Sequence, residues 1–281
     1  MTTTNLTRGL VIIDPQNCFM DLPGMPLSVL GATKDMDRLA AHLKRFGWDG
    51  RYERVYVTVD THPLDHISHA VRWVDADGNH PASFTIITAE AYEAGIWRAA
   101  QASDAAWQGE YLRRLSRPHC IWPVHGQAGE DEYLVYQGLS DVLISQEPDT
   151  FLNSQVGALK MVYKGMHRDV EQFGAFGADV PYPGAPETEI NQKLIDSINQ
   201  LDEVVFAGEA SSHCVMDSVN QFLTHVSQSD WQKVVVLRDC MSPVPQPPGG
   251  PDFPAMAEAW FLYLQNHGVR VQTLADYERT L

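Results

Sequence analysis

The chain has 281 residues, 44% of them hydrophobic, and its 36 acidic against 20 basic residues give a formal charge of −16. This excess of acid, without a cluster of Lys or Arg, excludes the electrostatic attraction on which binding to nucleic acid or anionic membranes depends. No run reaches the roughly 18 apolar residues of a membrane span, and Met1–Asn5 lack the basic and apolar pattern of a leader. We therefore expect a soluble, cytoplasmic protein whose partners are small molecules.

Length and cysteine content set the expectations for domains and redox state. A chain of this size can bury one large core, and no repeat, low-complexity tract or linker divides it. We predict a single domain over 1–281 with insertions near 67–118 and 126–158. Four scattered cysteines do not form a disulfide framework and are expected to be reduced; they are Cys18, Cys120, Cys214 and Cys240.

Six segments, in chain order, are predicted to be strands. Each is a continuous apolar or β-branched run, which is typical of strands covered on both faces. They are Leu10–Ile13, Val55–Val59, Lys160–Tyr163, Val204–Phe206, Val234–Leu237 and the weaker Val269–Val271.

Segments with apolar residues near helical spacing lie between these strands. This alternation predicts an α/β protein, a three-layer α/β/α Rossmann-like fold with a mainly parallel six-stranded sheet. The stretches 67–118 and 126–158 do not follow the alternation and are interpreted as insertions, with some helix in 89–115, and 243–254 is predicted to be a Pro/Gly-rich loop. The predicted helices are Met36–Phe46, Ile190–Leu201, Ser212–Val226 and Phe253–His267.

Reactive side chains follow four of the predicted strands. Asp14 follows the first, Asp60 the second, Lys164 the third, and Cys214 stands shortly after the fourth. The carboxyl ends of parallel strands share one edge of the sheet, where ligands bind. There, Asp14 could accept the thiol proton while Lys164 stabilises the thiolate. Taken singly, an Asp after a strand is often a turn former and a Lys is usually a surface charge.

The segment around Cys214 is the most informative in the chain. Gly208–Val215 interrupts an apolar run, and helical spacing resumes beyond it, which predicts strand, tight turn and helix. A thiol at a helix start lies near unpaired N–H groups and the positive end of the helix dipole, which favour the thiolate. Cys214 is therefore a candidate nucleophile, and the alternative is a buried structural cysteine.

A second group of residues is of the metal-binding kind. Asp60, His62 and His66 lie within seven residues of each other, and His125 could complete the set from another segment. A carboxylate with imidazoles suits Zn²⁺, Fe²⁺ or Mn²⁺ better than Ca²⁺ or Mg²⁺. Further histidines are candidates for the same role: His69, His80, His119 and His167.

Five segments together resemble a known family. Their order and context are those of the cysteine hydrolases of the isochorismatase-like superfamily, and the chain resembles the nicotinamidase (pyrazinamidase) branch most closely. The resemblance covers most of residues 8–240 apart from the insertions. The segments are Asp14–Phe19, Asp60–His62, Trp122–His125, Tyr163–Gly165 and Glu209–Val215.

The resemblance assigns roles by position. It implies a catalytic triad of Asp14, Lys164 and Cys214. It also implies a cis peptide bond between Glu209 and Ala210, and an oxyanion hole formed by the N–H groups of Ala210 and Cys214.

The resemblance further implies a bound divalent metal and a flat substrate. Phe19 and Trp122 match aromatic residues that sandwich a ring, and Gln16 matches a polar support. The matching metal ligands are Asp60, His62, His125 and, as in some nicotinamidases, His66.

The implied activity is cysteine-dependent hydrolysis of a small carboxamide, nicotinamide to nicotinate and ammonia, through a thioester. This would belong to NAD metabolism, and superfamily members often form homo-oligomers. The sequence departs from the usual pattern of the family at two positions. Cys18 replaces an acidic residue, and Glu209 stands where an apolar residue is frequent. A buried carboxylate at Glu209 would need a partner, and none can be identified from the sequence.

Other functions stay open from the sequence. Another amidohydrolase of the superfamily, acting on a ureido or amic acid substrate, would need a cationic clamp such as Arg72 or Arg168. A vinyl-ether hydrolase of this fold lacks the cysteine, so Cys214 argues against that function. A non-catalytic binding or assembly protein would tolerate loss of the triad, so the intact triad argues against that one.

Overall fold

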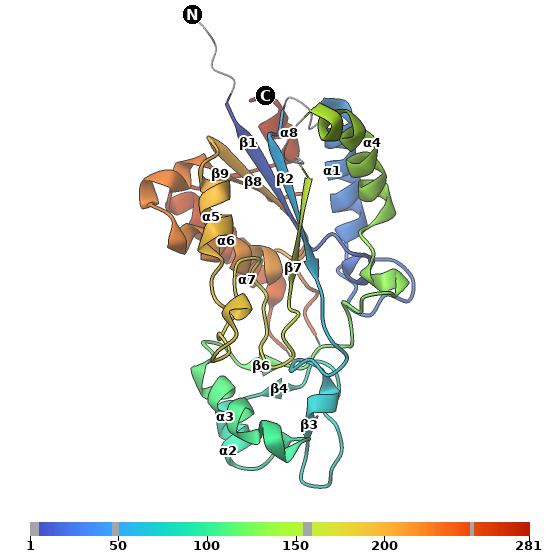
Figure 1. The fold of residues 1–281 in the computed structure, drawn as a ribbon, viewed down its shortest axis with the longest axis vertical. Helices are drawn as coiled ribbons and strands as arrows, with labels where there is room; N and C mark the ends of the chain where they lie inside the picture. Colours follow the sequence, from blue (N-terminus) through green and yellow to red (C-terminus); the bar gives the residue numbers. More distant parts are fainter. Residues whose placement is uncertain (1–5, 47–50, 154–158, 248–249) are drawn as a thin grey trace, which may run out of the picture.

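A central sheet with helices on its sides forms the core of the fold (Figure 1). The computed structural model describes residues 6–46, 51–153, 159–247 and 250–281. Every neighbouring pair of strands is parallel, in the order β10-β9-β8-β1-β2-β7. The predicted six-stranded sheet is therefore confirmed. Its strands are β1 (Arg8–Ile13), β2 (Arg54–Asp60), β7 (Leu159–Lys164), β8 (Glu203–Gly208), β9 (Val234–Leu237) and β10 (Arg270–Gln272).

Helices cover both faces of this sheet and make three layers. Leu10 and Ile12 of β1 pack in the apolar cluster of one face, and Val11 and Ile13 pack in that of the other. Both faces are apolar because both are covered, as in other parallel sheets. One face carries α1 (Ala32–Phe46), α4 (Gln137–Asn153) and α8 (Leu274–Glu278), and the opposite face carries α5 (Gln192–Asn199), α6 (Cys214–His225) and α7 (Phe253–Asn266).

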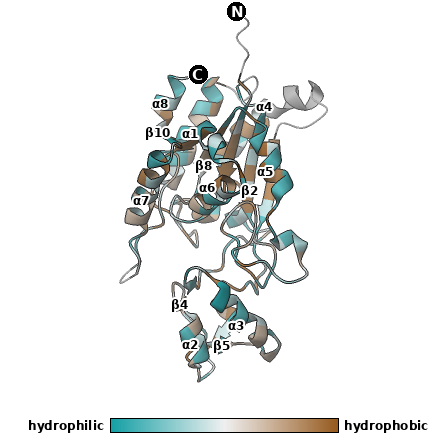
Figure 2. Cartoon of the chain, turned by 90° about the vertical axis from the view of Figure 1, so that its left-hand side faces the viewer, coloured by the Kyte–Doolittle hydropathy of each residue, from teal (hydrophilic) through white to brown (hydrophobic). Residues whose placement is uncertain are grey.

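Much of the first predicted insertion forms a lobe beyond the carboxyl ends of the strands, at the bottom of Figures 1 and 2. The lobe has its own apolar cluster around Trp73 and Tyr111. The strands of the central sheet form a separate hydrophobic region, which Figure 2 shows in brown. The helix expected in 89–115 is confirmed. The lobe contains α2 (Ala89–Glu93), α3 (Ala105–Arg114) and two antiparallel pairs, β3 (Trp73–Val74) with β5 (Arg98–Ala99) and β4 (Ile86–Ile87) with β6 (His119–Cys120).

The second predicted insertion contains a helix of the main fold. Helix α4 lies beside α1 and leads to β7, which pairs in parallel with β2, so it occupies the place of a crossover helix. Among its described side chains Leu139 and Leu143 are buried, and this short stripe is too weak to predict a helix. Residues 154–158 lie outside the described part. The division into one domain with insertions stays a prediction.

Helix α1 begins four residues before the predicted start at Met36. The carboxylate of Asp21 accepts the backbone N–H groups of Gly31 and Thr33, at 3.2 and 2.9 Å, and so satisfies donors at the helix start. This cap comes from ten residues upstream, and local periodicity does not reveal it.

The remaining segments connect these elements. Of the predicted loop 243–254, residues 243–247 and 250–252 lie outside helices and strands, and α7 begins at Phe253. Among the described residues, none of the helices has the length and apolar character that crossing a bilayer requires. Met1–Asn5 lie outside the described part. Short 3₁₀ helices are η1 (Asn17–Phe19), η2 (Ala70–Arg72), η3 (Ala102–Asp104), η4 (Asp131–Tyr133), η5 (Pro186–Thr188) and η6 (Gln228–Lys233).

Candidate active site

The strand ends bring four predicted residues together. Asp60 and Lys164 are register partners at the ends of β2 and β7. Asp14 follows β1, and Cys214 is the first residue of α6. Asp14 has a φ of 43°, a left-handed value that residues other than glycine rarely adopt and that is enriched at functional sites.

The ammonium of Lys164 lies at the centre of this group. Its Nζ is 3.0 Å from Asp14 Oδ2 and 2.9 Å from Asp60 Oδ1. The same nitrogen donates to Cys214 Sγ at 3.6 Å and to the carbonyl of Gln172 at 3.0 Å. Lys164 is only 2% exposed. A buried charge is tolerated when it is paired and hydrogen-bonded, and here two carboxylates supply the pairing.

Burial decides the resting protonation of the thiol. It raises the pKa of Cys214 well above the usual value, and the Lys164 charge offsets only part of that rise. Burial also raises the pKa of Asp14, again against the opposing charge of Lys164. Burial therefore opposes the effect expected of the helix start, which stays a prediction. The thiol stays protonated until a base takes its proton, and Asp14 is the nearby base.

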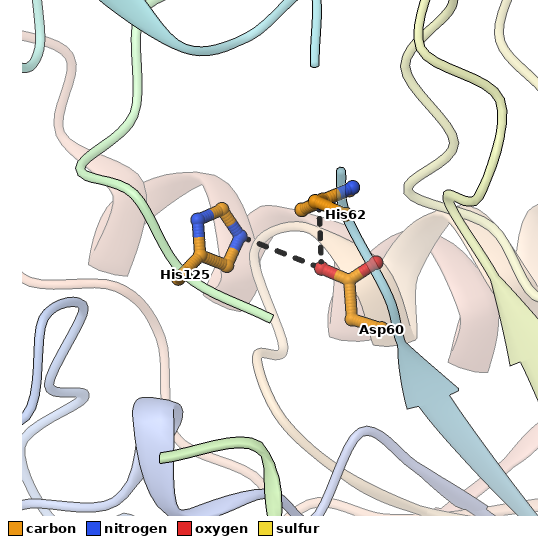
Figure 3. A group of neighbouring side chains, drawn as sticks. All are labelled: Asp60, His62 and His125. Atoms are coloured by element: carbon orange, nitrogen blue, oxygen red, sulfur yellow. Dashed lines mark ion pairs between the residues drawn. The ribbon is translucent and has the colours of Figure 1, made fainter. Parts of the chain in front are cut away.

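Asp60, His62 and His125 offer ligand atoms within 4.8 Å of one another. Figure 3 shows both rings turned toward the Asp60 carboxylate, with Nε2 of His62 at 3.1 Å and Nε2 of His125 at 3.4 Å from Oδ2. Burial opposes ionisation of Asp60, but the charges of His62 and Lys164 outweigh it and hold its pKa well below the usual range. The cluster is thus one carboxylate facing two imidazoles.

The hydrogen bonds of the two histidines test whether a metal fits. Nδ1 of His62 lies 3.0 Å from the Gly165 carbonyl, and Nδ1 of His125 lies 2.8 Å from the Pro123 carbonyl. A nitrogen that faces a carbonyl must carry its proton, so Nε2 is the atom of each ring that supplies a lone pair to a metal once the ring has lost its second proton. This is the tautomer that binds metals, with the outer carbonyls orienting the rings, so the donor set fits a divalent transition metal.

Gln16 holds the Asp60 backbone. Its Nε2 donates to the carbonyls of Asp60 and Tyr133, at 3.0 and 3.1 Å, and its Oε1 accepts the N–H of Asp60 at 2.6 Å. This amide is fully used within the protein. The structure therefore places Gln16 as a positioning residue for Asp60.

His66 lies outside the Asp60 cluster. Its Nδ1 lies 2.6 Å from Ser68 Oγ and its Nε2 lies 2.9 Å from the Val170 carbonyl, while its ring stacks on His62 with centroids 4.0 Å apart. It belongs to a second group that could hold a metal ion, with His62 and Glu171, whose ligand atoms also lie within 4.8 Å of one another. The role of His66 as a metal ligand stays a prediction, and its ring supports that of His62.

His69 is the histidine that sequence reasoning left unplaced and that the structure brings to the cluster. Its ring centroid lies 5.8 Å from that of His62 and 5.9 Å from that of His125. Nδ1 faces the Leu64 carbonyl at 3.1 Å, and the buried Nε2 has no hydrogen-bonding partner among the described residues. It therefore presents the same tautomer as the two rings above. His80 and His119 instead lie in the lobe, where their rings are hydrogen-bonded to the backbone carbonyls of Trp73 and Ile67 respectively.

A small cavity of about 20 Å³ joins the thiol to the metal-type cluster. Phe19 and Trp122, the predicted ring contacts, both line it. Arg72 and Arg168 are absent from its described lining, because they pair with acidic residues elsewhere: Arg72 with Asp104 and Asp169, and Arg168 with Asp65. The predicted cationic clamp is thus not at this cavity.

Five further lining residues were not named as site residues from the sequence: Leu27, Glu171, Phe173, His213 and Val244. Glu171 and Phe173 follow β7 in an irregular segment, which has no periodic signal. His213 stands next to Cys214, so its proximity could have been inferred. Burial lowers the pKa of His213 to about 3, so its ring is neutral.

The turn before Cys214 has the predicted cis peptide bond between Glu209 and Ala210. The carbonyl of Ala210 accepts the N–H groups of His213 and Val215 at 3.0 and 3.1 Å. The side chain of Glu209, which had no partner in the sequence, accepts the N–H of Ser242 at 3.1 Å. Burial first, and then the nearby Asp35 charge, raise the pKa of Glu209 well above its usual value.

We expect Glu209→Gln to flatten the dependence of stability on pH. The folded-state pKa of Glu209 lies above its unfolded value, so its contribution is complete below the unfolded pKa and is lost as pH rises through the folded one. In that window the wild-type free energy of unfolding should fall by up to about 1.4 kcal/mol per pH unit more than that of the variant. Urea unfolding across pH measures this, with the exposed Glu258→Gln as control. Parallel curves for wild type and Glu209→Gln would contradict it.

Comparison with known proteins rests on structure, since no family model and no curated protein matches the sequence. The yeast nicotinamidase Pnc1p bound to the inhibitor nicotinaldehyde is 20% identical with a TM-score of 0.62, over 95% of this chain and 100% of that chain. The Pyrococcus horikoshii pyrazinamidase in complex with zinc is 16% identical with a TM-score of 0.54, over 95% and 99%. An isochorismatase family protein from Desulfovibrio vulgaris is 18% identical with a TM-score of 0.52, over 98% of each chain. The chain therefore has the isochorismatase-like fold that these nicotinamidase, pyrazinamidase and isochorismatase family structures share.

Proposed function

We propose that the protein is a cysteine-dependent amidohydrolase of the isochorismatase-like superfamily that hydrolyses a small carboxamide, with nicotinamide as the favoured substrate. One observation carries the proposal: a buried lysine joins a thiol at 3.6 Å to a carboxylate at 3.0 Å. A thiol with a base and a cation beside it is the arrangement of an activated nucleophile. The shared fold with nicotinamidases supports the choice of amide chemistry.

The first half of the reaction forms a thioester. Asp14 accepts the proton of Cys214, and the sulfur attacks the amide carbon. Lys164 stabilises the thiolate as it forms. The carbonyl electrons move to oxygen, and we assign the N–H groups of Ala210 and Cys214 to hold that oxyanion. Asp14 then returns its proton to nitrogen, the C–N bond breaks, and ammonia leaves.

The second half hydrolyses the thioester. Water enters the place that ammonia has left and gives its proton to Asp14 as its oxygen attacks the acyl carbon. The C–S bond breaks, Asp14 returns this proton to the sulfur of Cys214, and the acid product leaves. Asp14 thus acts first as base and then as acid in each half of the reaction. Its raised pKa suits this exchange, because a carboxylate that binds a proton more tightly than usual is a stronger base toward the thiol.

A divalent metal belongs to the proposal, with Zn²⁺, Fe²⁺ and Mn²⁺ as the ions that suit the donors. Asp60, His62 and His125 would hold it, and His66 supports the His62 ring. When bound, the metal would act as a Lewis acid that coordinates the ring nitrogen of nicotinamide and so orients the substrate. Phe19 and Trp122 would contact the two sides of the ring, and Gln16 keeps Asp60 in place.

Ammonia release tests the proposal. Nicotinamide should release ammonia, while ureido and amic acid substrates of similar size should release at least about tenfold less, because the cavity presents no cationic clamp among its described lining. Faster ammonia release from the ureido or amic acid compounds would instead favour the alternative function, an amidohydrolase that acts on those substrates. Absence of release from every amide would overturn the proposal.

Metal removal should abolish most of this activity. After dialysis against a chelator, we expect kcat/KM for nicotinamide to fall at least about 100-fold and to return when Zn²⁺, Fe²⁺ or Mn²⁺ is added back. His125→Ala should lower the bound metal measured by elemental analysis, whereas His80→Ala in the lobe should leave it unchanged. Full metal content in His125→Ala would contradict the ligand set.

The proposal also includes the metabolic role, location and assembly of the enzyme. We infer a role in NAD metabolism, a cytoplasmic location, no nucleic-acid partner, and a homo-oligomer. Sedimentation velocity of the purified chain tests the last of these.

A further inference from the structure

A larger cavity adjoins the small one, and we call it the side chamber. It has a volume of about 260 Å³. Trp122, Glu171, Phe173 and His213 line both cavities, so the two meet along these residues. The small cavity of about 20 Å³ is near the volume that one water molecule needs. The side chamber approaches the roughly 300 Å³ at which small-molecule sites begin.

The walls of the side chamber are mostly apolar and come from two separate parts of the chain. Tyr111 and Leu115 belong to the lobe, and Phe253 and Met256 belong to α7. His213 lies where the walls meet, with its ring centroid 4.6 Å from that of Phe253 and 5.4 Å from that of Trp122. An aromatic and aliphatic lining favours an apolar, ring-sized occupant.

One polar group in the chamber has unused bonding capacity. Glu171 is 3% exposed; one carboxylate oxygen accepts the N–H of Gln172 at 3.0 Å, and the other has no partner among the described residues. Buried polar atoms are nearly always hydrogen-bonded. A carboxylate accepts hydrogen bonds only, so the missing partner is a donor.

The other charged groups of the chamber also favour a donor over an anion. One guanidinium nitrogen of Arg117 pairs with Asp217 at 2.5 Å and with Asp179 at 3.3 Å, while its Nε has no hydrogen-bonding partner among the described residues. Its charge is therefore offset by two carboxylates, and Asp179 itself lines the chamber. The rings of His119 and His213 are neutral because burial lowers their pKa. A carboxylate entering the chamber would meet Glu171, and the guanidinium of Arg117 in the lining is already paired with two carboxylates.

We propose that the side chamber binds a second part of the substrate, a ring-sized apolar group that carries an amine, joined to the carboxamide that is hydrolysed. This inference rests on the proposed function, because it assumes that the amide is cleaved at Cys214. Glu171 would accept the hydrogen bond of the amine, and the walls of the lobe and of α7 would enclose the ring. The chamber would thus extend the substrate range to nicotinamide-like amides that carry such a group.

Binding of benzylamine to the complete protein tests the chamber without requiring turnover. By NMR titration or calorimetry, benzylamine should bind and benzoate should bind at least about tenfold more weakly. Glu171→Gln should weaken benzylamine about tenfold, since hydrogen bonds to charged groups are the strong ones, and should leave benzyl alcohol within about twofold. Equal binding of benzylamine and benzoate, or no effect of Glu171→Gln, would overturn the assignment.

Filling the chamber provides a second test that does not depend on Glu171. Leu115→Trp and Met256→Trp, from opposite walls, should each weaken benzylamine at least about tenfold. Leu262→Trp is the matched control, because Leu262 lies on the same helix as Met256 and is 58% exposed outside the chamber lining. Thermal unfolding of each variant shows that it is folded. Unchanged binding in both filled variants would overturn the proposal.

Turnover separates this inference from the proposed function. A nicotinamide that carries a benzylamine arm on its ring should have a kcat/KM at least about tenfold above that of nicotinamide, and Met256→Trp should remove that advantage. If nicotinamide were hydrolysed but benzylamine did not bind, the proposal for the side chamber would be wrong and the proposed function would stand. Benzylamine binding with no hydrolysis of any amide would defeat the proposed function alone.

Discussion

Replacing Cys214 by alanine is expected to lower kcat/KM for nicotinamide at least about 10⁴-fold, because the thiol forms the only covalent bond of the reaction to the enzyme. Cys214 is in contact with Lys164 and Asp14 but not with the metal-type cluster. Metal content and binding of the ring should therefore survive. Ammonia release under saturating metal, together with elemental analysis and calorimetric binding of nicotinamide, gives the three readouts.

A matched control separates the nucleophile from a general effect of cysteine loss. Cys240 is also a buried free cysteine, and it lies in the apolar core beyond β9. Cys240→Ala should lose some stability and keep its turnover. If Cys214→Ala kept more than about one hundredth of the wild-type turnover, Cys214 would not be the nucleophile.

Replacing Lys164 by methionine is expected to destabilise the protein by about 3–5 kcal/mol, because it leaves two buried carboxylates without their shared counter-ion. The Lys164 ammonium pairs with Asp14 at 3.0 Å and with Asp60 at 2.9 Å. Turnover should fall as well, since the cation beside the thiol is lost. Urea unfolding at neutral pH measures the change in the free energy of unfolding.

Two further variants make this prediction specific. Lys160→Met changes the same residue type on the same strand, at a partly exposed position over the Tyr56 ring, and should cost about 1 kcal/mol or less. Adding Asp14→Asn to Lys164→Met should recover part of the lost stability, because it removes one of the two unpaired charges. A Lys164→Met protein as stable as Lys160→Met would contradict the role of the ion pairs.

The sequence predicts the catalytic edge well because strand ends are local features. Asp14, Asp60 and Lys164 each follow an apolar run, and a parallel sheet necessarily brings such positions to one edge. In the structure the carboxylates of Asp14 and Asp60 each lie about 3 Å from the Lys164 ammonium. A strand end does not reveal how deeply the following side chains are buried, and burial raises the pKa of Cys214 against the expected effect of the helix start.

Features that depend on distant partners could not be predicted. The partner of Glu209 is the N–H of Ser242, 33 residues away. His66 and His69 differ in what faces their ring nitrogens, and spacing along the chain carries no information on that. Helix α4 has a weak apolar stripe and is defined by its packing beside α1. The side chamber arises only when the lobe meets α7.

The most direct test of the account is to trap the acyl-enzyme. Nicotinamide is mixed with the metal-loaded protein, the reaction is quenched in acid within the first turnover, and the digested peptides are analysed by mass spectrometry. The account predicts a nicotinoyl group on the peptide that contains Cys214, and none on peptides that contain Cys18, Cys120 or Cys240. Full turnover with no acyl group on Cys214, or turnover that persists after Cys214 is alkylated, would contradict it.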